Sequence, residues 1–170
     1  MTPMFAILSL WPSGGAVASR RRWVERVPAR SVAAAQPSRE LETELASTDG
    51  FIDALVDLSL ESWLAIGRDL VADRNGLSVR QDAWADVEAA ITRRDLGMTV
   101  WSVRDALDTA AFLASRHASG WSREKRCAFA AAHGAAEAAA LSVLVRADIP
   151  AESLRALCGP FATSLELGLF

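Results

Sequence analysis

The sequence predicts an all-α fold, arranged as an antiparallel bundle of four main helices with a short C-terminal helix. Two observations lead to this prediction. Apolar residues recur at a spacing of three to four along several segments of helical length, which is typical of amphipathic helices. Alanine, the strongest helix former, is abundant, and clusters of Gly, Asn, Ser and Pro separate the periodic segments.

The first 37 residues differ in composition from the remainder, which we predict to be a single domain covering residues 38–170. Residues 1–37 hold four of the six prolines, a Gly14-Gly15 pair and an Arg20-Arg21-Arg22 run. This composition predicts a disordered basic tail. An organellar targeting segment or a start codon assigned too early are the alternatives. A secretory signal is disfavoured, because all the positive charge follows the apolar run at 4–10.

Residues 40–170 carry 12 basic and 20 acidic groups, a balance of −8. This negative charge disfavours nucleic acid and anionic membranes as partners. The two cysteines, Cys127 and Cys158, are too few for a disulfide framework. We therefore expect a cytoplasmic protein with reduced thiols.

The helices expected in the first half of the domain start with a short lead-in segment at 38–45. Thr48-Asp49-Gly50 is predicted to be a break, followed by a helix over about 51–74 that ends at Asn75-Gly76. The next helix is predicted to start at Ser78, where Gln81 completes a capping box, and to end at Leu96-Gly97.

Three further helices are expected in the second half of the domain. One runs over about 99–117. A second starts after Ser122, a favourable N-cap, and reaches about residue 146. The last covers residues 151–158, since Gly159-Pro160 is predicted to interrupt it.

The stretch 128–145 is apolar nearly all round, which predicts the central, buried helix of the bundle. Glu137 in its middle disfavours a position in lipid. Small residues recur at a spacing of four, namely Ala130, Gly134, Ala138 and Ser142. This ridge is expected to seat a neighbouring helix, so that Gly134→Leu would overpack it, with a homodimer contact as the alternative.

One tryptophan falls in or next to each main helix. These residues, Trp63, Trp84, Trp101 and Trp121, are predicted to be large core side chains whose indole N–H groups need partners.

The central helix also carries the strongest candidate for a ligand site. His133 and Glu137 lie one helical turn apart, and a buried Glu137 would need a cation, for which Arg104 or Arg68 is expected. Asp108 follows Arg104 by one turn. These five residues are the candidates for a polar ligand pocket. Repeated Glu-x-x-His motifs and zinc-type spacings do not occur, so neither a metal nor another cofactor is predicted.

Residues 87–107 resemble part of a helix-turn-helix, because a Gly turn at Gly97 precedes a capped helix. Under this alternative the contacts to DNA would come from Thr99, Ser102, Arg104, Arg20, Arg21 and Arg22. The match is limited, because the second helix would present Asp105 in place of a basic set.

The sequence has no Gly-rich phosphate loop, nucleophile elbow, H-E-x-x-H motif or paired cysteine ligands. This pattern favours a non-enzymatic cytosolic interaction or regulatory module. Its expected partner is an unidentified protein or a second copy of the chain.

Overall fold

The computed structural model describes residues 39–165, so the predicted basic tail lies outside the described residues. The described part is all helical and contains six helices. They are α1 (Arg39–Val56), α2 (Leu60–Ala72), α3 (Arg74–Arg94), α4 (Gly97–Ser115), α5 (Arg123–Leu144) and α6 (Ala151–Leu165). The all-α prediction is confirmed, but the predicted count of four main helices and one short one is not.

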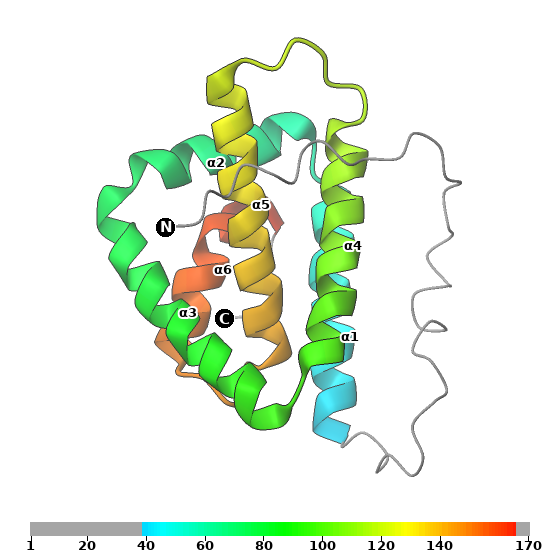
Figure 1. The fold of residues 1–170 in the computed structure, drawn as a ribbon, viewed down its shortest axis with the longest axis vertical. Coiled ribbons are helices and arrows are strands. Elements are labelled where there is room, and N and C mark those ends of the chain that lie inside the picture. The colour runs from blue at the N-terminus through cyan, green and yellow to red at the C-terminus, as the bar shows by residue number, and fades with distance from the viewer. Residues whose placement is uncertain (1–38, 166–170) are drawn as a thin grey trace. The chain divides into compact units, whose positions relative to one another are not determined.

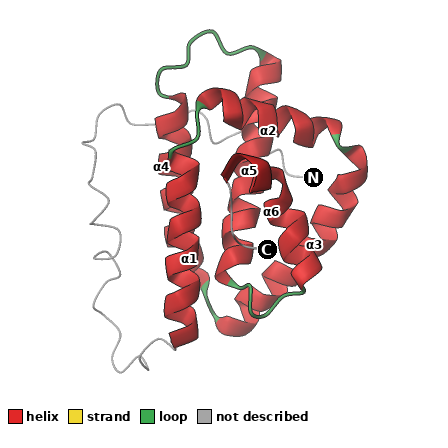
Figure 2. Cartoon of the chain, turned by 180° about the vertical axis from the view of Figure 1, so that it is seen from behind, coloured by secondary structure: helices red, strands yellow, loops and turns green. Residues whose placement is uncertain are grey.

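Helix α5 lies at the centre and packs against α1, α2, α4 and α6 (Figure 1). Its most extensive contact is with α2, while α3 packs chiefly on α6. Helices α1 and α4 pack against each other, with α1 behind α4 in Figure 1 and in front of it in Figure 2. Residues 139–145 are buried on all sides, whereas the first half of α5 is buried along one face only. The prediction of a central buried helix is therefore confirmed for its C-terminal part.

The first two helices differ from the predicted ones. Helix α1 continues through the expected break at residues 48–50, because Thr48 and Phe51 are buried in the core there. The Thr48 hydroxyl is satisfied within the helix, donating to the Glu44 carbonyl oxygen at 2.8 Å. The chain breaks instead after Val56. There the Ser59 side chain caps α2 by accepting a hydrogen bond from the Ser62 N–H. The single helix predicted over about 51–74 is therefore wrong, since the chain forms the end of α1 and the separate helix α2 there.

The junction of α2 and α3 consists of a single residue, Asp73. Its backbone N–H donates to the Asp69 carbonyl oxygen at the end of α2, and its carboxylate accepts from the Gly76 N–H at the start of α3. Gly76 thus lies in the first turn of α3 and not at a helix end, and the predicted capping box at Ser78 is wrong. Hydrogen bonds from the Arg80 side chain and the Gly76 N–H lower the pKa of Asp73.

The remaining helix ends agree better with the sequence. Asp95 ends α3 with a φ of 52°, a left-handed conformation that Asp tolerates better than most residues. Ser122 caps α5 as predicted, accepting from the Lys125 N–H.

The end of α6 differs from the prediction. This helix passes through Gly159 and Pro160, where an end was predicted. Phe161 is fully buried, and its ring contacts the Phe51 ring edge-on with 5.9 Å between the ring centroids. This contact packs the C-terminal part of α6 against α1.

Candidate functional site

Four of the five candidates for the polar pocket meet on the α4–α5 seam. Arg104 Nε lies 2.6 Å from Glu137 Oε1, and His133 Nε2 lies 3.0 Å from Asp108 Oδ1. Arg104 and Asp108 lie one turn apart on α4, and Glu137 and His133 lie one turn apart on α5. The helices are therefore linked by two neighbouring pairs, one at each of two successive turns. Of the two cations expected for Glu137, Arg104 is the one that pairs with it.

This cluster lies at the surface and not in the core. The side chain of Arg104 is 44% exposed and that of Asp108 is 58% exposed. The Nε2 atom of His133 is shielded from solvent and lies within ion-pair distance of Asp108, yet the alignment does not make a hydrogen bond. Arg68 is exposed on α2 and does not belong to the cluster. The expectation of a buried Glu137 is thus wrong, because half-exposed side chains form its surroundings.

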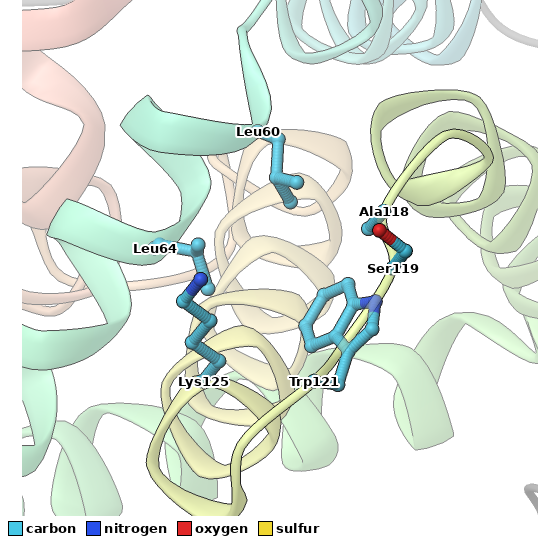
Figure 3. Close-up of a pocket in the computed structure, with 6 residues that line it drawn as sticks. All are labelled: Leu60, Leu64, Ala118, Ser119, Trp121 and Lys125. Carbon is cyan, nitrogen blue, oxygen red and sulfur yellow. The ribbon is translucent and has the colours of Figure 1, made fainter.

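A small cleft lies elsewhere, between the start of α2 and the α4–α5 connection (Figure 3). Its lining residues are Leu60, Leu64, Ala118, Ser119, Trp121 and Lys125, and its volume is about 80 Å³. Typical sites for small organic ligands measure roughly 300–1,000 Å³. This cleft therefore has room for a few atoms at most, and none of the predicted pocket residues lines it.

Next to the cleft, three aromatic rings form a chain. Phe129 contacts Trp63 at a centroid distance of 5.6 Å and Trp121 at 5.3 Å. Trp63 is fully buried, as predicted, but its indole N–H has no hydrogen-bond partner. Trp84 and Trp121 are half-buried.

The predicted ridge on α5 contacts another helix only at its C-terminal end, where Ser142 is fully buried and its hydroxyl lies 3.5 Å from Cys158 Sγ of α6. Its first half faces open space. A Cβ added at Gly134 would meet no atom within 4 Å, and Ala130 is exposed as well. Along this first half of α5 the buried small residues are Ala128, Ala132 and Ala136, on the opposite face of the helix. Close approach is instead permitted by Gly67 of α2, where an added Cβ would lie 1.8 Å from the Ala128 carbonyl oxygen.

Helices α3 and α4 have the order of a helix-turn-helix but not its packing. Helix α3 packs on α6 and α5, whereas α4 packs on α5 and α1. Thr99 is half-buried and Ser102 is exposed on α4, while Arg104 is held by Glu137. Arg20, Arg21 and Arg22 lie outside the described residues.

The outer face of α4 carries three large apolar side chains, one of which, Trp101, is predicted from the sequence to be a core residue. Met98 is 73% exposed, Trp101 69% and Phe112 44%. The prediction that Trp101 is a core residue is therefore wrong. Its position was available from the sequence, since Trp101 lies about 100° around the helix from Val100, one of the buried residues.

A second polar cluster, which no pattern in the sequence predicts, joins three parts of the chain. Arg94 Nη1 of α3 lies 2.7 Å from Glu44 Oε2 of α1 and 3.1 Å from Asp148 Oδ2 in the α5–α6 connection. Burial tends to lower the pKa of Arg94, but the hydrogen bonds and charges of Glu44 and Asp148 outweigh this and raise it. Glu44 is 3% exposed, and its Oε1 atom lacks a partner. Partners 50 residues apart leave no local pattern in a sequence.

Within residues 39–165, no group of three His, Cys, Asp or Glu side chains is placed to hold a metal ion. By length and composition alone α5 could span a membrane, a test that the core helix of a soluble protein also passes. Half of its most apolar window is buried against the other helices.

Comparison with known proteins does not add a family to this geometry. No protein-family model, no curated protein sequence and no solved structure matches the chain.

Proposed function

We propose that the protein is a cytoplasmic helical bundle that acts as a non-enzymatic interaction or regulatory module. The observation that carries this proposal is the outer face of α4, where Met98 and Trp101 are both about 70% exposed. Large apolar side chains grouped on one exposed face mark interaction sites in soluble proteins. Tryptophan is also one of the residue types enriched among the side chains that dominate binding energy at the centre of protein interfaces.

The two alternatives have less support. A ligand site at His133 and Glu137 has its polar groups assembled, but they are paired with each other at the surface. DNA binding through α4 would need free cations, whereas the single Arg of this helix is paired with Glu137, and Asp105 and Asp108 lie beside it. Both features favour a protein as the partner.

The test is a pull-down from native lysate with the tagged full-length chain and two variants, Trp101→Ala and Val79→Ala. Val79 is also exposed, at 55%, but lies on α3, so its variant is the matched control. We expect a protein that co-purifies with the wild type and Val79→Ala and is lost with Trp101→Ala. A chain that remains monomeric in light scattering and captures the same proteins in all three forms would contradict the proposal.

A further inference from the structure

The exposed face of α4 has a regular pattern that specifies its partner. Five exposed residues, which we call the α4 stripe, follow one another at spacings of three, four, three and four: Met98, Trp101, Asp105, Asp108 and Phe112. This is the a/d spacing of a helix that pairs with another helix. The buried residues Val100, Val103 and Leu107 lie on another side of α4. Helix α4 therefore has one apolar face that packs in the core of the protein, and a second face, the α4 stripe, that is exposed to solvent.

The chemistry of the α4 stripe is apolar at both ends and acidic in the middle. Met98 and Trp101 form one end, Phe112 forms the other, and the carboxylates of Asp105 and Asp108 lie between them. The only cation of α4, Arg104, is hydrogen-bonded to Glu137 and is directed to the α5 side. His133 approaches Asp108 from that same side, yet the Asp108 side chain stays 58% exposed. The middle of the stripe is thus an accessible pair of negative charges.

The two carboxylates indicate which kind of molecule can bind to the α4 stripe. A second copy of α4, paired in either direction, would bring the aspartates of the two chains together, and like charges facing each other in an interface cost several kcal/mol. An anionic membrane surface is disfavoured for the same reason. An amphipathic helix with Arg or Lys at its two central seam positions and large apolar residues on both sides would satisfy the whole stripe.

We infer that the α4 stripe binds a basic amphipathic helix of a partner protein, about two heptads long. This inference rests on the proposed function and names the class of partner. Apolar residues of the partner pack on Met98, Trp101 and Phe112, while its central cations pair with Asp105 and Asp108. The indole ring of Trp101 offers a further surface for a partner guanidinium.

The test uses two dye-labelled, stapled 18-residue helical peptides, measured by fluorescence anisotropy against the full-length chain. Both peptides carry Leu at the positions that would face Met98, Trp101 and Phe112. At the two positions that would face Asp105 and Asp108, one peptide carries Arg and the other carries Glu. We expect the Arg peptide to bind at least about tenfold tighter, a difference of ~1.4 kcal/mol. Raising the salt concentration should reduce this preference, because screening weakens exposed charge pairs.

Two variants extend the test to individual residues. The double variant Asp105→Lys/Asp108→Lys should invert the preference, so that the Glu peptide binds tighter, and Trp101→Ala should weaken both peptides. Circular dichroism establishes that each variant keeps its helices, which is expected because all three residues are exposed.

Equal binding of the two peptides, or no binding of either, would overturn the inference. So would a concentration-dependent dimer that Trp101→Ala abolishes, since the occupant would then be a second copy. If the peptides fail while a cellular protein is still lost with Trp101→Ala, the proposed function stands and only the basic helix is rejected. If no protein depends on Trp101 and the peptides fail as well, both are rejected.

Discussion

At the scale of single residues, the environment of a side chain depends on its angle around the helix and on what packs there. Trp63 and Trp101 are chemically identical, but Trp63 is fully buried and Trp101 is 69% exposed. A count of one tryptophan per helix could not separate them. Their positions relative to the buried stripe could have done so for Trp101. The unpaired indole N–H of Trp63 could not be foreseen, because it depends on atoms from other helices.

A titration prediction belongs to this scale. Partial burial, and secondarily the charge of Asp53, raise the pKa of Asp49 above 3.8. The folded state therefore binds the proton more tightly than the unfolded state, and stability falls as the pH rises through the folded pKa. Replacing Asp49 by Asn removes this loss. We expect Asp49→Asn to be more stable than the wild type at pH 7, by less than about 1 kcal/mol because solvent screens a half-buried charge.

Urea denaturation of both proteins at pH 7 and at pH 3 measures this difference. The advantage of Asp49→Asn should shrink at pH 3, where the carboxyl group is mostly protonated in both states. An advantage of equal size at the two pH values would show that the substitution acts through packing and not through charge.

At the scale of helices, the sequence identified where helices lie more reliably than where they end. Leu55, Trp63 and Ile66 are all buried, and their three-to-four spacing continues across the break at Ser59. This spacing predicts one helix over 51–74 where the structure has two. Conversely, Gly50 and Gly159 were read as breaks, although buried neighbours hold each helix together. Local propensity is a weak signal, and tertiary packing overrides it at these ends.

The crossing of α2 and α5 gives a prediction at this scale. Gly67→Ala would place a Cβ 1.8 Å from the Ala128 carbonyl oxygen, so the two helices must move apart. We expect this variant to lose about 3 kcal/mol of unfolding free energy, at the upper end of the usual cost of overpacking. Thermal and chemical denaturation followed by circular dichroism would measure it.

Gly134→Ala is the matched control, because its Cβ would meet no atom within 4 Å. Alanine in an exposed helix position should add roughly 0.5–1 kcal/mol relative to glycine. Similar losses in the two variants would mean that the ridge first inferred on the Gly134 face is the real contact.

At the scale of the whole molecule, the all-α class and the central helix followed from composition and periodicity, whereas the contacts between distant segments did not. Arg104 is one of the two cations expected for Glu137, because a carboxylate in the middle of an apolar helix needs a charged partner. The cluster of Arg94, Glu44 and Asp148 has no such local signature. It joins α1, α3 and the α5–α6 connection at one point.

This cluster should contribute more to stability than the surface pair. Arg94→Met leaves Glu44, which is 3% exposed, without its cation, and we expect a loss of about 3 kcal/mol in unfolding free energy. Arg104→Met breaks a pair that solvent already screens, so its loss should stay below about 1 kcal/mol.

Denaturant titrations of the two variants make the comparison. Adding Glu44→Leu to Arg94→Met should recover part of the loss, since no buried charge then remains. Equal losses for Arg94→Met and Arg104→Met would contradict the assigned difference in burial.

The single-residue junction at Asp73 has a consequence for how the chain can vary in length. Because one residue ends α2 and starts α3, one inserted residue would rotate α3 by ~100° relative to α2. Ala83, Val87 and Ala90 would then leave the core together. The α4–α5 connection at residues 116–122 is longer, and none of its residues is fully buried, so it can absorb the same insertion. Natural insertions and inserted tags are thus compatible with the α4–α5 connection and excluded from the α2–α3 junction.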